Sequence, residues 1–117
     1  MRLQEINYDN ARPIDGYGPG FFRVAGEVLP APALILADDA RPWGGLEDSE
    51  TLLALEGQID VLFIGTGPEM TPVPAPLRRA LEEAGIAVEP MASASACRTF
   101  NILLSEGRRV AAALLAA

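Results

Sequence analysis

A run of apolar residues in mid-chain, ending at two glycines, constrains the fold more than any other feature. Residues 59–67 read Ile-Asp-Val-Leu-Phe-Ile-Gly-Thr-Gly. The apolar part is too short for a core helix, and its side chains point to both sides of a strand, so it predicts a strand covered on both faces, as in an α/β sheet. Ligands of open α/β sheets bind beyond the carboxyl ends of such strands, which makes Gly65, Thr66 and Gly67 a candidate site.

The segments after this strand predict a crossover unit. Residues 77–84 form a helix with one apolar stripe, and Pro76 lies in its first turn. Residues 86–89 form a short strand. Strand, helix and strand together span about thirty residues, the size of a right-handed crossover with parallel strands.

Two further elements are expected near the end of the chain. A helix begins at Ser93 or Ser95 and ends at Gly107. Residues 108–116 are ambiguous, since their alanines favour a helix but Gly107 interrupts the pattern. Because the preceding unit predicts another strand, we assign them to a strand.

The N-terminal half predicts short β-elements separated by turn residues. A hairpin turns at Ala25 and Gly26, and Pro30 and Pro32 confine its second strand to an edge or a bend because proline cannot donate to a ladder. The expected elements are an edge strand over residues 3–8, an irregular connection over 13–20, hairpin strands over 21–24 and 27–29, a buried strand over 33–36, a loop over 41–45 and a short helix over 50–56.

Length and composition fit one globular domain over residues 1–117. A chain of 117 residues buries about two-thirds of the surface that its unfolded form exposes, and half of its residues are apolar. We therefore expect a single α/β domain that folds alone.

Two missing residue types exclude whole reaction classes. The chain has no histidine and no lysine. Without histidine there is no Ser-His or Cys-His pair, and without lysine there is no Schiff base and no P-loop lysine. One cysteine and no histidine cannot build a tetrahedral zinc site from soft ligands. We expect a protein that is not an enzyme.

The acidic charge bears on partners and location. The net charge is −7, and all of the excess acidity lies in residues 1–60. This charge disfavours nucleic acid and anionic membranes as partners. No segment is long enough to cross a bilayer, the N-terminus lacks an apolar signal core, and the single Cys97 fits a reducing compartment, so we expect a cytoplasmic protein.

The segment of Gly65, Thr66 and Gly67, here named the glycine turn, favours a sharp turn of the backbone over a nucleotide-binding site. A dinucleotide fingerprint needs a third glycine and a helix that begins directly after it, whereas residues 68–76 intervene here. Backbone amides at Gly65, Thr66 and Gly67 could still hold a small anion or carboxylate, with Arg98 nearby.

The expected helix over residues 93–107 carries a second group of candidates. Cys97 lies on its apolar face, where a lone thiol is usually a small buried hydrophobe. Arg98, Thr99 and Asn101 lie on its other faces and form either a solvated surface or a recognition patch for a carboxylate.

The loop over residues 41–45 carries the only tryptophan. Trp43 either caps the core or forms an exposed partner anchor. The acids around it lack the spacing of a calcium-binding loop, so we interpret them as a solvated face that favours a basic partner, with no metal.

Several stretches in this order and spacing resemble a known family. They are residues 61–67, 77–84, 85–88, 96–101 and 106–111. The chain is similar to the small domain shared by uncharacterised bacterial and archaeal proteins, a mitochondrial complex I assembly factor and an adipogenesis-associated vertebrate protein. The resemblance implies a three-layer α/β domain: a central mixed, mostly parallel sheet with helices on its faces and a smaller N-terminal β layer. It implies no enzyme reaction and no cofactor.

Two functions remain open from the sequence. The first is a non-enzymatic interaction module that assists the assembly of a protein complex, such as a respiratory complex, through an unidentified protein partner. The alternative is a small-ligand-binding domain or weak enzyme with a pocket at Gly65, Thr66, Gly67, Cys97, Arg98 and Asn101. The partner surface of the first would comprise Trp43, the glycine turn, Arg98 and Thr99.

Overall fold

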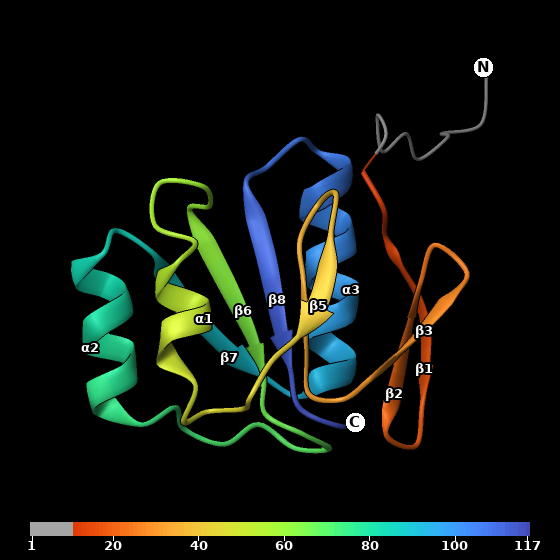
Figure 1. Cartoon of the computed structure of the whole chain (residues 1–117), viewed down its shortest axis with the longest axis horizontal. Helices are drawn as coiled ribbons and strands as arrows, with labels where there is room; N and C mark the ends of the chain where they lie inside the picture. The colour runs from red at the N-terminus through yellow and green to blue at the C-terminus, as the bar shows by residue number, and fades with distance from the viewer. Residues whose placement is uncertain (1–10) are drawn as a thin grey trace.

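The computed structural model describes residues 11–117, which form two β-sheets and three helices (Figure 1). The expected strand over residues 3–8 lies outside the described residues. In chain order the elements are β1 Ile14–Gly18, β2 Phe21–Val24, β3 Glu27–Pro30, β4 Ala33–Ile35, β5 Ala40–Pro42, α1 Ser49–Leu53, β6 Val61–Gly65, α2 Ala75–Glu83, β7 Ala87–Met91, α3 Ser93–Ser105 and β8 Val110–Leu114.

The larger sheet has five strands in the order β5-β4-β8-β6-β7. β6 runs parallel to β7 and β8, and β4 runs antiparallel to β5 and β8. The predicted mixed sheet, the strand–helix–strand unit of β6, α2 and β7, and the assignment of β8 to a strand are confirmed. β6 is covered on both faces, and its Leu62, Phe63 and Ile64 are buried, because apolar side chains leave both sides of the strand.

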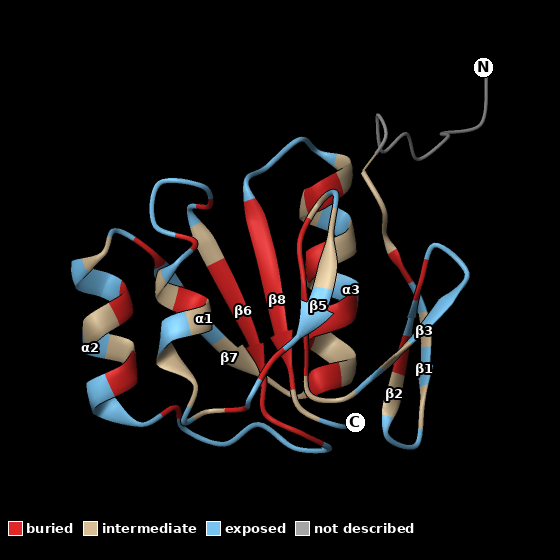
Figure 2. Ribbon diagram, in the orientation of Figure 1, coloured by how far each residue is buried: buried red, intermediate tan, exposed pale blue. Residues whose placement is uncertain are grey.

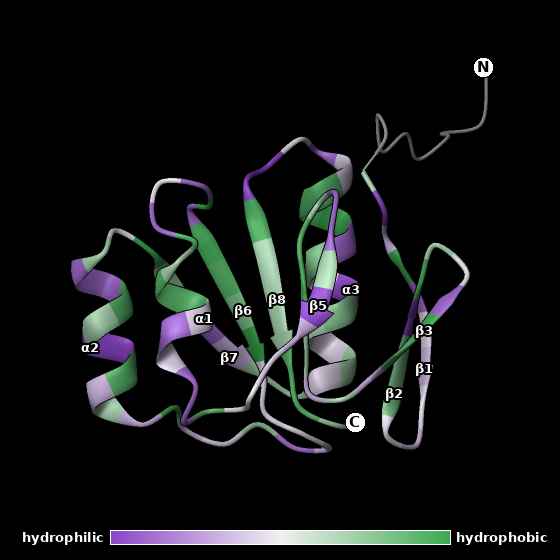
Figure 3. Ribbon diagram, in the orientation of Figure 1, coloured by the Kyte–Doolittle hydropathy of each residue, from purple (hydrophilic) through white to green (hydrophobic). Residues whose placement is uncertain are grey.

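Each face of the large sheet packs against a different layer (Figures 2 and 3). On one face, Leu62 and Ile64 of β6 join the apolar sides of α1 and α2 in one core cluster. On the other, Phe63 joins Phe100 of α3 and Phe22 of β2 in a second cluster. α3 and the small sheet therefore share one face of the large sheet, and the expected helices and N-terminal β layer are confirmed.

The alanines of β8 explain its central position. Ala111 and Ala113 face the first core cluster, and Ala112 faces the second. All three are fully buried. Small side chains on both faces of a central strand allow the covering layers to approach closely, so the segment is a strand although alanine has a higher intrinsic preference for helix.

The small antiparallel sheet has the order β1-β2-β3. β1 corrects the expectation of an irregular connection over residues 13–20. Gly18 at its end leaves room for the next strand, because a Cβ there would overlap the ring of Phe21. β5 likewise corrects the expected loop at residue 41, since residues 40–42 pair with β4.

No helix within residues 11–117 is long and apolar enough to cross a membrane.

Candidate functional site

The glycine turn at the carboxyl end of β6 is buried. Gly65, Thr66 and Gly67 are all largely inaccessible to solvent. The Thr66 N–H donates to the carbonyl of Met91 at 2.9 Å, and the Gly65 carbonyl accepts from Leu115 N–H at 2.9 Å. The turn is therefore joined to both neighbouring strands rather than open to a ligand.

Ser93, the first residue of α3, binds the turn to the end of β8. Its hydroxyl accepts from the Gly67 N–H at 2.9 Å and donates to the Leu115 carbonyl at 2.7 Å. Its own N–H donates to the Gly67 carbonyl at 2.8 Å. Ser93 is fully buried. The amide that the sequence offered for an anion is thus used by a side chain of the chain itself.

Thr66 closes the loop that follows the turn. Its hydroxyl donates to the Glu69 carbonyl at 2.8 Å and accepts from the Thr71 N–H at 2.9 Å. These bonds hold the loop in a fixed shape while Met70 at its tip is 59% exposed. The hydroxyl proton is therefore donated to a backbone carbonyl, and one of the two acceptor positions of the oxygen is occupied by a backbone N–H.

Cys97 lies in the core on the inner side of α3. It is only 5% exposed. Burial raises the pKa of its thiol to about 11, against an opposing effect of the nearby Arg98 charge. A thiol with such a pKa carries almost no thiolate at neutral pH, and the thiolate is the nucleophilic form.

The other candidates of α3 point elsewhere. Arg98 is exposed, and its guanidinium donates to the Ser95 hydroxyl at 3.3 Å. Asn101 pairs with the backbone of Ile14: its Oδ1 accepts from the Ile14 N–H at 2.8 Å and its amide nitrogen donates to the Ile14 carbonyl at 2.9 Å. Asn101 therefore joins α3 to the small sheet in the way a neighbouring strand would, while Thr99 is half-buried beside it.

Trp43 packs in the core formed by α1, α2 and the large sheet. It is 3% exposed, and its indole N–H donates to the Asp48 carbonyl at 3.1 Å. Asp48 is the N-cap of α1 and accepts from the Thr51 N–H and hydroxyl. Trp43 thus takes the core-capping position that the sequence left open as one of two alternatives.

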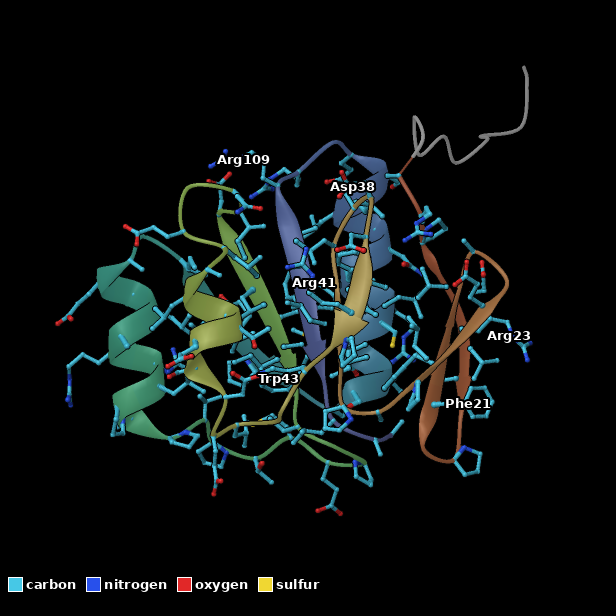
Figure 4. The ribbon with its side chains drawn as sticks, in the orientation of Figure 1. Phe21, Arg23, Asp38, Arg41, Trp43 and Arg109 are labelled. Atoms are coloured by element: carbon cyan, nitrogen blue, oxygen red, sulfur yellow. The ribbon has the colours of Figure 1, made fainter. Side chains whose placement is uncertain are left out.

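The predicted residues consequently lie in separate places rather than in one cleft. Gly67 adjoins the start of α3, and Asn101 adjoins β1. Trp43 lies next to the end of β5 (Figure 4). The buried hydroxyl of Ser93 is not among the site groups that the sequence predicts. A serine at the start of a helix that follows a parallel strand was the available signal, because such a residue lies next to the ends of the neighbouring strands.

Three hollows of the described surface lie away from the glycine turn. One of about 310 Å³ lies at the opposite end of β6 and is lined by residues 36–38, 58–59 and 108–110. Arg109 at its edge pairs with Asp60 at 2.7 Å, and this bond lowers the Asp60 pKa. A second of about 240 Å³ is lined by residues 29–32 and 41–43, and a third of about 320 Å³ lies between α1 and α2. Within residues 11–117, no three metal-ligating side chains come together.

The comparisons with known proteins agree on one family. Residues 14–115 match the model of the family described as "Protein of unknown function (DUF498/DUF598)". The chain is 51% identical to an uncharacterised protein of Rhodobacter capsulatus over 98% of this chain and 93% of that protein. It is 35% identical to the Danio rerio NADH dehydrogenase [ubiquinone] 1 alpha subcomplex assembly factor 3, over 87% of this chain and 63% of the assembly factor.

A solved structure shows the same fold. The crystal structure of a protein described as an outer membrane protein from Bartonella henselae superposes with a TM-score of 0.82 at 36% identity, over 95% of this chain and all of that one. The family resemblance expected from the sequence is confirmed. The chain spans less than two-thirds of the Danio rerio assembly factor's length.

Proposed function

Because the chain belongs to the family of proteins of unknown function DUF498/DUF598, we propose that it is a non-enzymatic interaction module that assists the assembly of a respiratory protein complex. The observation that carries the proposal is its similarity to proteins named as assembly factors of NADH dehydrogenase. In this role the chain contacts a protein partner and works in the cytoplasm, without a cofactor.

The state of the reactive side chains supports a role without catalysis. The Cys97 thiol is buried with a pKa of about 11. The hydroxyls of Thr66 and Ser93 are engaged in bonds that hold the glycine turn. These groups serve the fold, whereas a general base or nucleophile needs to reach a substrate.

The alternative, a ligand site at the glycine turn with Arg98, has less support. The Gly67 N–H already bonds to Ser93, and the Arg98 guanidinium contacts Ser95 on the surface of α3. A small anion at the turn would have to displace an internal hydrogen bond.

Gene deletion in the host tests the proposal. We expect a lower amount of assembled NADH dehydrogenase, measured on native gels stained for NADH oxidation, and recovery when the gene is returned. A Cys97→Ala variant should restore assembly as well as the unaltered gene does. Unchanged levels of the assembled complex after deletion would overturn the proposal.

A further inference from the structure

The hairpin of β2 and β3 fixes which backbone groups face outward. Its turn residues Ala25 and Gly26 both have positive φ, 51° and 81°, as in a type I′ turn. In such a hairpin the residues flanking the turn, Val24 and Glu27, exchange both hydrogen bonds, and bonded and non-bonded pairs then alternate. The Arg23–Val28 pair is therefore of the non-bonded kind.

Another hydrogen bond agrees with this alternation. The Ala31 N–H donates to the Gly20 carbonyl at 2.9 Å, where the pattern places a bonded pair. The N–H and C=O of Val28 consequently point away from β2, and so does the C=O of Pro30.

β3 is an edge of the small sheet, and that edge is open at Val28. Val28 is 55% exposed. Within residues 11–117, no hydrogen bond engages its backbone on the outer side. Pro30 has no N–H to leave unpaired there, as is usual for proline on an edge strand. The edge thus presents one donor and two acceptors to an added strand.

A hollow lies at the end of this edge. It has a volume of about 240 Å³, lies between β3 and β5, and is lined by residues 29–32 and 41–43, which are apolar except Arg41. Leu29 points to the inner side of the sheet, so a residue opposite Leu29 on an added antiparallel strand would direct its side chain toward the hollow.

The charge on the outer side of the sheet indicates what kind of added strand would bind there. Arg23 is exposed next to Val28, has no ion pair within the described part of the chain, and points away from α3 (Figure 4). A residue opposite Val28 lies on the same side as Arg23, within reach of its long side chain. A second copy of the chain is disfavoured as the occupant because each copy carries a net charge of −7.

We infer that β3 is a docking edge to which an extended segment of a protein partner adds as a fourth strand. The segment places an apolar side chain in the hollow beside Leu29 and a carboxylate opposite Val28, within reach of the Arg23 guanidinium. Strand addition supplies affinity through backbone hydrogen bonds and specificity through the alternating side chains. This inference rests on the proposed function, for which it names the contact surface.

Val28→Pro and Val28→Ala form a matched pair for the test. Proline removes the outward N–H and places a ring on the edge, whereas it leaves the bonds between β2 and β3 intact. Alanine shortens the side chain and keeps the N–H. Selection of random linear peptides on the immobilised full chain supplies the probe. We expect selected peptides with a carboxylate directly next to an apolar residue, bound about tenfold or more weakly by Val28→Pro than by Val28→Ala.

Hydrogen exchange in the unaltered protein gives a second measurement that does not depend on how the proline variant folds. The Val28 amide should exchange more slowly when the selected peptide is bound. Equal affinity of both variants, an unchanged exchange rate at Val28, a selection that yields no binding peptide, or a dimer paired through β3 in sedimentation would each overturn the inference.

Complementation of the gene deletion separates this inference from the proposed function. Rescue by Val28→Ala but not by Val28→Pro supports both. Rescue by both variants overturns the docking edge and leaves the assembly role standing. A deletion without effect on NADH dehydrogenase overturns the assembly role. The peptide affinities of the two Val28 variants and the hydrogen exchange of Val28 would then still test the docking edge.

Discussion

At the scale of single residues, two polar side chains hold segments together that the chain brings from far apart. The Ser93 hydroxyl accepts from the Gly67 N–H and donates to the Leu115 carbonyl. The Asn101 side chain bonds both the N–H and the carbonyl of Ile14. A buried backbone group without a partner costs free energy comparable to a lost hydrogen bond. Residues that the sequence offers as ligand-binding groups can therefore be fully used by the fold.

Asn101→Ala tests this use directly. Removing the amide leaves both polar groups of Ile14 without their partner, so we expect the free energy of unfolding to fall by about 1–3 kcal/mol in urea denaturation. Thr99→Ala on the same helix, where no hydrogen bond is lost to the described residues, should have a much smaller effect. Equal effects of the two substitutions would show that the Asn101–Ile14 bonds contribute little.

Cys97 predicts a dependence of stability on alkaline pH. Its pKa is raised to about 11 in the folded chain from 9.0. The unfolded chain therefore releases the proton first, so the stabilising effect is complete below about pH 9 and is lost as the pH rises toward 11. Urea midpoints measured across this range should fall less steeply for Cys97→Ala. The variant and the unaltered chain would show parallel curves if the thiol were accessible to water.

At the scale of elements, the end of β6 requires glycine for space. A Cβ at residue 65 would come within 2.7 Å of the Ser93 Oγ and 2.8 Å of the Ser93 Cα. We expect Gly65→Ala to lower the free energy of unfolding by about 1–3 kcal/mol, since overpacking forces the start of α3 away from the sheet.

Gly16→Ala is the matched control for that substitution, because no atom lies within 4 Å of the added methyl. Its effect on stability should be small or slightly favourable, as alanine lowers the entropy of the unfolded chain. A Gly65→Ala variant as stable as Gly16→Ala would show that the contact between Ser93 and β6 relaxes at little cost.

Helices and strands with a clear hydrophobic pattern of their own are predicted from the sequence. Strands that form only because they pair with an adjacent strand are missed. The predictions of β6 and α2 are confirmed. A strand buried on both faces shows a continuous apolar run, and a helix buried on one face shows an apolar stripe, so both patterns are visible in the sequence. β1 and β5 were missed because their glycine and proline residues indicate turns, whereas pairing with β2 and β4 decides their structure. The site was the least predictable part, since hydrogen bonds from Ser93 and Asn101 to distant segments leave no mark in local sequence.

At the scale of the whole molecule, the small sheet and the α/β part share a core. Phe22 of β2 is fully buried and joins the cluster that contains Phe63 of β6 and Phe100 of α3. A layer that shares its core with the central sheet should unfold together with it, since neither part keeps its apolar face covered alone.

Phe22→Ala tests this cooperativity. Loss of the ring should lower the free energy of unfolding of the entire chain by about 3–5 kcal/mol because it leaves a cavity between the small sheet, α3 and β6. Trp43 lies in the other core cluster, so its fluorescence reports the far side of the large sheet. We expect its urea midpoint to fall together with that of the circular dichroism signal, whereas Arg23→Ala, on the exposed side of the same strand, should shift neither. A Trp43 midpoint that stays in place after Phe22→Ala would mean that the small sheet unfolds independently and that β3 is presented by a separately mobile unit.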